Sequence, residues 1–188
     1  MSGAAHSAAG AGLEIRAYRE ADWPAVLPIL QETFRAGDTY AFSPQSTEVE
    51  IHRIWIEAPA RTFVACEPDG RIQGTYFIKA NQPGLGAHVC NCGYVVAAQA
   101  QGKGIAARMC EHSQAQALAL GFRAMQFNFV VATNTRAIRL WERLGFSVVG
   151  RLPGAFNHQQ LGYVDALVMF KQLDVARSEP SGSSRTAG

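Results

Sequence analysis

The chain has 188 residues, of which 48% are hydrophobic, so it is long enough to form one domain with a substantial core. Its formal net charge is only +2, from 17 basic and 15 acidic residues, and this balance argues against nucleic acid as a partner. No apolar run approaches the roughly 20 residues that a membrane-spanning helix needs, and the N-terminus lacks the pattern of a secretory signal. We therefore expect a cytoplasmic protein with no membrane partner.

Both ends of the chain differ in composition from the rest. Residues 1–12 and 174–188 are rich in Ala, Gly and Ser and lack apolar periodicity, which predicts disordered tails around one domain over residues 13–173. Cys90 and Cys92 have the spacing C-x-C, but no second pair of Cys or His residues follows at the spacing that a metal site requires. We therefore expect the cysteines to be structural thiols and expect no metal. The four cysteines are Cys66, Cys90, Cys92 and Cys110.

The first part of the domain is predicted to contain a strand and two helices. Residues 13–18 alternate between apolar and polar side chains, which is typical of a strand. Asp22 caps a helix that has Pro24 in its first turn and ends at Gly37. The capping-box pattern T-E-V-E that begins at Thr47 predicts a second helix.

Strands and helices then alternate. The composition of residues 68–70 predicts a turn and hence an antiparallel hairpin, and the fourth strand of the domain follows at 88–96. The order β-α-α-β-β-β-α-β-α-β-β predicts an α/β (α+β) fold with a mixed sheet and helices on both faces. The remaining predicted elements are strands at 61–67 and 71–79, a helix at 105–120, a strand at 123–131, a helix ending at 144, and strands at 146–150 and 163–171.

A glycine-rich loop joins the strand at 88–96 to the next helix. Its sequence, Q-A-Q-G-K-G, ends at Gly104, and exposed glycine backbone before a helix N-terminus favours binding of an anion such as a phosphate. A dinucleotide fingerprint requires an acidic residue about 20 positions on, and none occurs between Glu111 and Glu142. A P-loop requires Ser or Thr where Gly104 stands. Both are rejected, and an ordinary glycine-containing turn is the alternative for the loop alone.

Two sequence blocks resemble the GCN5-related N-acetyltransferase (GNAT) superfamily. The first is Gln99-x-x-Gly102-x-Gly104, and the second, Asn134 to Phe146, is similar to that family's Asn-x-x-Ala…Leu-Tyr-Glu-Lys-Leu-Gly-Phe segment. The element order also agrees. The resemblance implies a mostly antiparallel central sheet of six to seven strands, with helices on both faces and one parallel strand pair that splays apart around acetyl-CoA.

The resemblance also implies an acetyl-CoA-dependent N-acetyltransferase without a metal, in which the acetyl group passes directly to a small-molecule amine. Backbone N–H groups of the glycine loop would bind the pyrophosphate, with Lys103 adding a positive charge. An N–H at Val95 would stabilise the oxyanion, and Asn134 would assist at the thioester. The implied cofactor-binding residues are Val95, Val96, Gln101, Gly102, Lys103, Gly104, Ile105, Ala106, Asn134 and Trp141.

Trp141 departs from the family pattern. Family members often have a tyrosine there, which is taken to protonate the leaving thiolate, and an indole N–H cannot do so. Tyr163, Tyr40 or a water held by Asn134 are the alternatives. Trp141 also fits a core aromatic residue on an amphipathic helix.

The acceptor is expected at Asn91 and Asn128, two asparagines in strands that read as buried. They either pair internally or bind a small polar acceptor. A narrower resemblance, to the yeast proline-analogue (azetidine-2-carboxylate) N-acetyltransferases, rests on the spacing of Asn91, Asn128 and Asn134 and on Trp141. It implies that Asn91 and Asn128 hold an amino or imino acid.

Three groups are candidates for the general base: His88, Asp38 and a water. The usual pKa of a histidine suits a general base, but strand alternation turns His88 away from Asn91. This orientation favours a histidine that packs against its neighbours or supports the site without touching the substrate. We expect His112 and His158 at the surface or in loops. Other small amines or a protein N-terminus are alternative acceptors, a non-catalytic acyl-CoA sensor is the alternative from another class, and a homodimer is compatible with the sequence.

Overall fold

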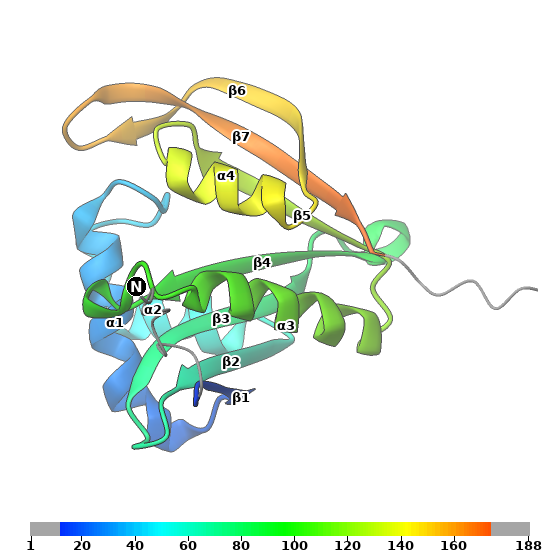
Figure 1. Cartoon of the computed structure of the whole chain (residues 1–188). Coiled ribbons are helices and arrows are strands. Elements are labelled where there is room, and N and C mark those ends of the chain that lie inside the picture. The colour runs from blue at the N-terminus through cyan, green and yellow to red at the C-terminus, as the bar shows by residue number, and fades with distance from the viewer. Residues whose placement is uncertain (1–11, 174–188) are drawn as a thin grey trace, which may run out of the picture.

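The structure, a computed structural model, describes residues 12–173 (Figure 1). Apart from Gly12, the tails expected to be disordered lie outside the described residues. The strands are β1 (Glu14–Ala17), β2 (Arg61–Cys66), β3 (Ile72–Ala80), β4 (Val89–Val96), β5 (Ala124–Val131), β6 (Ser147–His158) and β7 (Gly162–Gln172). The helices are α1 (Trp23–Ala36), α2 (Glu48–His52), which continues as a π-helical turn (Arg53–Glu57), α3 (Ile105–Ala119) and α4 (Thr135–Arg143).

The seven strands form one sheet in the order β1-β2-β3-β4-β5-β7-β6. All neighbouring strands are antiparallel except β4 and β5, which are parallel. The expected mixed, mostly antiparallel fold with one parallel pair is confirmed. The pairing of β4 with β5 is limited to Val89 with Ala124 and Cys90 with Met125, after which the two strands separate (Figure 1).

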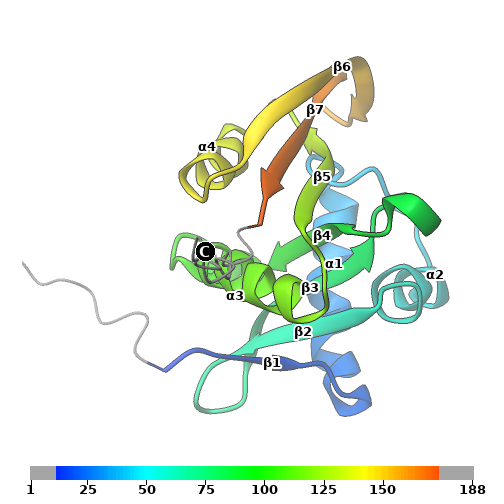
Figure 2. The ribbon, with the colours of Figure 1, turned by 90° about the vertical axis from the view of Figure 1, so that its right-hand side faces the viewer.

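Helices α1 and α2 cover one face of the sheet, and α3 and α4 cover the other (Figure 2). Successive side chains of β3 point to opposite faces of the sheet, and two of them show what lies on each face. The ring of Phe77 packs against Trp55 at 4.8 Å on the α1–α2 side, whereas the Tyr76 hydroxyl lies 2.6 Å from Nδ1 of His112 on α3. His112 is therefore half-buried between helix and sheet, and the expectation that it lies at the surface is wrong.

Two predicted helix starts have different outcomes. The capping box is confirmed, because Glu50 N–H donates to Thr47 Oγ1 (3.3 Å) and Thr47 N–H donates to Glu50 Oε2 (2.8 Å). Asp22 stands at the N-cap of α1, but its carboxylate makes no cap bond there. It accepts instead from Arg19 N–H (2.8 Å) and pairs with Arg16 (2.7 Å), which fixes the turn before the helix.

Strand β6 is much longer than the sequence predicts. It runs over 12 residues, past the predicted end at Gly150 and through Pro153 and Gly154, which lie outside the predicted strand. Two register shifts absorb these residues, and Gly154 takes a φ of 56° where Asp165 Oδ1 accepts its N–H (2.8 Å). With these bulges β6 stays paired with β7 as far as His158.

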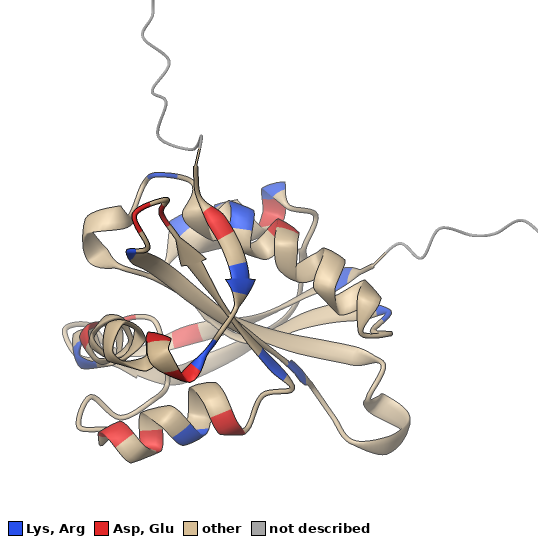
Figure 3. Ribbon diagram, turned by 90° about the horizontal axis from the view of Figure 1, so that it is seen from below, with Lys and Arg blue, Asp and Glu red and all other residues tan. Residues whose placement is uncertain are grey.

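Basic and acidic residues are interspersed along the ribbon in Figure 3, as the near balance of charges leads one to expect. Within the described residues, no helix is long and apolar enough to cross a bilayer.

The four cysteines are free and buried, as predicted. Burial raises the pKa of Cys66 and Cys92, and that of Cys110 to about 11, so little reactive thiolate is present near neutral pH. We expect the folded protein to react with a thiol reagent such as DTNB only on the timescale of unfolding, whereas the urea-unfolded chain releases four equivalents at once. Rapid labelling of the native protein at pH 7 would contradict this burial.

Candidate functional site

A cavity of roughly 1110 Å³ extends through the place where β4 and β5 separate. Its lining comes from both faces of the sheet. The glycine loop, the start of α3 and helix α4 line one part, and α1 with the loop after it, the end of β3 and the tip of the β6–β7 hairpin line the other. The separation of two strands thus connects two chambers that a continuous sheet would keep apart.

The cavity brings together the residues that the sequence assigns to coenzyme and acceptor binding. Lys103 is the exception, because it is exposed and does not contribute to the lining. The others line the cavity: Asn91, Val95, Val96, Gln101, Gly102, Gly104, Ile105, Ala106, Asn128, Asn134 and Trp141.

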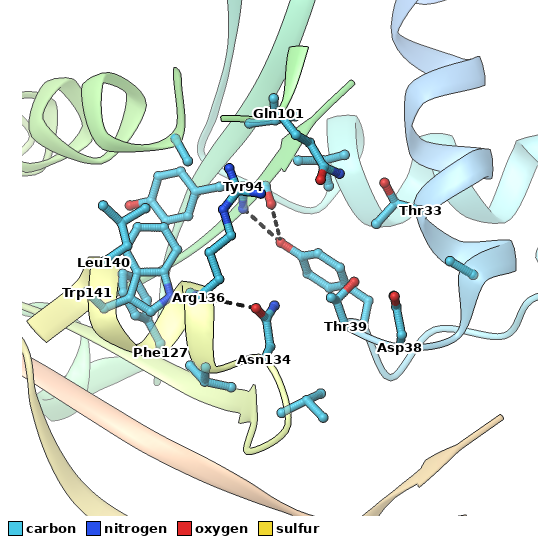
Figure 4. A pocket seen from close by; sticks show the side chains of 18 of the residues that line it. Thr33, Asp38, Thr39, Tyr94, Gln101, Phe127, Asn134, Arg136, Leu140 and Trp141 are labelled. Carbon is cyan, nitrogen blue, oxygen red and sulfur yellow. Dashed lines mark hydrogen bonds between the residues drawn. The ribbon is translucent and has the colours of Figure 1, made fainter. Parts of the chain in front are cut away.

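The glycine loop has the geometry of an anion cradle. Gly102 and Gly104 have φ values of 84° and 78°, which residues with a side chain rarely adopt. Ile105 then begins α3, and no group within residues 12–173 accepts from the first N–H groups of this helix. A Cβ on Gly102 would lie 3.5 Å from Nη2 of Arg136, whose side chain reaches from α4 toward Gln101 (Figure 4). The cation beside the loop in the cavity is therefore Arg136, which sequence reasoning missed although it lies within the second block.

The open edge of β4 is held by a tyrosine from the loop after α1. Ala97 N–H donates to Gln73 O on β3 (2.9 Å), so odd-numbered residues of β4 turn their backbone groups toward β3. The backbone N–H and C=O of Tyr94 point away from β3, into the space that opens where β5 separates from β4. The N–H of Tyr94 donates to Tyr40 Oη (2.8 Å), and the C=O of Tyr94 accepts from the same hydroxyl (3.0 Å).

This alternation corrects one expectation. The N–H of Val95 points toward β3, and only its buried side chain lines the cavity, so it cannot serve as the oxyanion donor. The N–H groups of Cys92 and Val96 have the parity of Tyr94 and point into the separation between β4 and β5. Sequence alternation gave the side-chain faces, but the side on which β5 departs was needed to orient the backbone.

Trp141 is both a core residue and part of the cavity wall. It is 8% exposed, and its ring centroid lies 5.2 Å from that of Tyr94 and 5.1 Å from that of Phe127. Of the tyrosines considered as acids, Tyr163 is 78% exposed and lies outside the lining, whereas Tyr40 is in it. Burial raises the pKa of Tyr40 well above its usual value, so its hydroxyl stays protonated.

Asn134 has a structural bond as well as a place in the cavity. Its Oδ1 accepts from Ala137 N–H (3.1 Å) and so caps α4. The amide nitrogen of the same side chain is left to donate elsewhere. Figure 4 shows Asn134 on the α4 side of the pocket, opposite Thr39 and Asp38.

Both acceptor asparagines line the cavity and both have partners. Asn91 is half-buried, and its Nδ2 donates to Gln126 O (2.9 Å), which leaves Oδ1 as an acceptor. Asn128 accepts from Gln126 Nε2 (2.8 Å) and donates to Asn81 Oδ1 (2.6 Å). Asn128 is exposed, contrary to expectation, because β5 has already left β4 at that point.

The tip of the β6–β7 hairpin forms a wall that sequence reasoning missed. His158, Gln160 and Leu161 line the cavity there, and Gln159 N–H contacts Gly37 O at 3.5 Å. His158 Nδ1 accepts from Gln160 N–H (3.1 Å), so a neutral ring carries its proton on Nε2 and acts as a donor. The segment reads only as a polar loop in the sequence.

The candidates for the base separate clearly. His88 is exposed, lies outside the cavity lining and has Nδ1 3.2 Å from Leu85 O, so the expected packed role is wrong. Asp38 lines the cavity from the loop after α1. Asp38 is thus the candidate side chain that the fold brings to the site.

Comparisons with known proteins agree with this geometry. Residues 23–146 match the model of the acetyltransferase (GNAT) family. The chain belongs to the GNAT family. A solved GCN5-related N-acetyltransferase from Kribbella flavida is 42% identical and superposes with a TM-score of 0.83 over 87% of this chain and 99% of that one.

Two further relatives extend the picture of the family. N-acetyltransferase aca1 of Schizosaccharomyces pombe is 40% identical over 98 residues, which is 50% of this chain and 46% of that protein, so the match spans less than half of the relative's length. A phosphinothricin acetyltransferase from Sinorhizobium meliloti, solved in complex with AcCoA, has a TM-score of 0.77 at 20% identity, over 86% of this chain and 89% of that one. This second likeness concerns the fold alone.

Proposed function

We propose that this GNAT-family protein is an acetyl-CoA-dependent N-acetyltransferase that acts on a small amino or imino acid. One observation carries the proposal. A single cavity passes through the sheet where β4 and β5 separate, and it joins an anion cradle on one face to a polar chamber on the other. A thioester bound in the first chamber could meet an amine bound in the second.

The cradle fits the coenzyme. Positive φ at Gly102 and Gly104 turns the loop so that backbone N–H groups at the start of α3 are free for the pyrophosphate, and Arg136 adds a charge beside them. Bound acetyl-CoA supplies an activated acetyl thioester. Trp141 and Leu140 would form an apolar wall for the pantetheine arm.

The chain's own groups then work by positioning and by electrostatic stabilisation. The N–H groups of Cys92 and Val96 point into the separation, and one of them replaces Val95 as the oxyanion donor that we propose. The free amide nitrogen of Asn134 would bond at the thioester. Asp38 would accept a proton from the amine, directly or through water.

The acceptor class rests on the polar chamber and on likeness. Asn91 and Asn128 line it, in the spacing that resembles the yeast proline-analogue enzymes. The relative named N-acetyltransferase aca1 supports N-acetylation without naming an acceptor.

A thiol-release assay tests the proposal. Purified protein with acetyl-CoA is offered amino acids, imino acids including proline and azetidine-2-carboxylate, simple amines and a peptide with a free N-terminus. Release of CoA with an amino or imino acid is the expected result. Release only with the peptide or with plain amines would move the acceptor class, and tight acetyl-CoA binding without release from any amine would indicate a non-catalytic sensor.

Asn128→Ala probes the acceptor chamber. We expect the KM for the acceptor to rise or kcat to fall, roughly 10-fold overall, with acetyl-CoA affinity unchanged, because the lost amide lies on the acceptor side. Asn81→Ala is the matched control, since Asn81 is a partner of Asn128 outside the cavity lining. Equal losses in the two variants, together with a lower melting temperature, would mean that the amide chain is only structural.

We also propose a cytoplasmic location, which the four unpaired thiols support because reducing compartments keep cysteines free. Fractionation of cells that express the tagged protein measures it. A homodimer is compatible with the proposal, and sedimentation equilibrium gives the oligomeric state.

A further inference from the structure

Lys79 brings a positive charge to the acceptor side of the cavity. It lies near the end of β3, directly opposite Asn91 on β4, so the two side chains are neighbours on the face that α1 and α2 cover. Lys79 is half-buried, and its Nζ lies 5.5 Å from the ring centroid of Phe77. Within residues 12–173 the ammonium forms no hydrogen bond and no ion pair.

The neighbouring amides are already committed. Asn91 uses its Nδ2 on Gln126 O, and both ends of the Asn128 amide are bonded to side chains. Lys79 is therefore the charged donor in this chamber whose hydrogens are not taken up by the described residues. Apart from the ring of Phe77, this partly desolvated ammonium has no partner among the described residues, and an anionic ligand would offset the cost of its desolvation.

The phosphates of the coenzyme do not account for this charge. Arg136 stands beside the glycine loop, and Arg143 also lines the cavity from α4. Lys79 is level with Asn91, which is five residues, or about 17 Å of extended strand, from Val96 at the loop end of β4. The two ends of the cavity thus have separate cations.

Carboxylates line the same chamber without neutralising Lys79. Glu32 on α1 and Asp38 after it contribute to the lining, and neither forms an ion pair with Lys79. A chamber with separated positive and negative groups complements a ligand that itself carries both charges.

We propose that Lys79 binds a carboxylate on the acceptor and so selects amines that carry an acid group next to the nitrogen over plain amines. This inference rests on the proposed acetyl transfer and adds the residue that decides the acceptor class. Lys79 is a specificity residue, and Glu32 and Asp38 face the ammonium end of the same ligand.

The test compares azetidine-2-carboxylate with its carboxamide, which has the same ring and amine but no negative charge. In Lys79→Met, kcat/KM for the acid falls roughly 10- to 100-fold, as expected for loss of a charge-assisted bond, while the value for the carboxamide changes less than about 2-fold. Lys79→Arg restores much of the activity toward the acid. The KM for acetyl-CoA and the melting temperature stay as in the wild type.

The outcomes separate the two proposals. Equal losses for acid and carboxamide, or a wild-type enzyme that does not prefer the acid, overturn the role of Lys79 and leave acetyl transfer standing. If no amine is acetylated, the proposed function fails. Calorimetry of azetidine-2-carboxylate binding in the presence of CoA then tests, without turnover, whether Lys79 binds the carboxylate. Binding that is weaker in Lys79→Met supports the inference, and absent or unchanged binding overturns it.

Discussion

Gly102→Glu is expected to weaken acetyl-CoA binding by at least about 100-fold, or roughly 2.7 kcal/mol. A side chain at Gly102 would project toward Arg136, whose Nη2 lies 3.5 Å from the position of the new Cβ. The glutamate would then pair with that arginine and set a negative charge where the pyrophosphate is proposed to bind. Isothermal titration with acetyl-CoA measures the loss.

Gly70→Glu is the matched control. Gly70 has a φ of 85°, against 84° at Gly102, and nothing lies within 4 Å of its Cβ position in the turn between β2 and β3. Both variants incur the same backbone strain, so both should lose similar stability. Only Gly102→Glu should lose acetyl-CoA. Retained affinity in that variant would show that the loop is not the coenzyme site.

Part of the fold follows from local sequence signals, because two of the predicted helix boundaries have a chemical cause. Thr47 and Glu50 form the predicted box, and Gly37 ends α1 with a φ of 59°. The length of β6 could not be predicted, since Pro153 and Gly154 are strand breakers unless a bulge accommodates them, and the bulge depends on Asp165 in the partner strand.

The site was predicted where it depends on contiguous motifs and missed where it depends on strand separation. The glycine loop and Asn134 were found because their spacing is local. Asn128 was expected to be buried, but β5 leaves β4 before reaching it. Lys79 on β3 and His158 on β6 line the cavity only because the fold brings their strands to it, and no local motif marks them. For Lys79 the one available signal was its position on β3 opposite Asn91, on the same face of the sheet.

Tyr40→Phe is the second variant with a large expected effect. The change keeps the ring, which stacks on Phe42 with centroids 5.6 Å apart, and removes only the hydroxyl. Tyr94 then loses a partner for both its N–H and its C=O at the open edge of β4, which costs about 1–3 kcal/mol of stability for each group left unpaired. Thermal or urea unfolding measures this loss.

Activity should fall with it, because the same edge carries the N–H groups of Cys92 and Val96 and a shift of about 1 Å can cost about 100-fold in rate. We expect kcat/KM to drop at all pH values without a change in the shape of the pH profile, since Tyr40 acts by holding the strand. Tyr163→Phe, at a 78% exposed tyrosine outside the cavity, should be neutral. If Tyr40→Phe removes only the alkaline limb of the profile and leaves stability intact, its hydroxyl transfers a proton, and the strand keeps its edge without it.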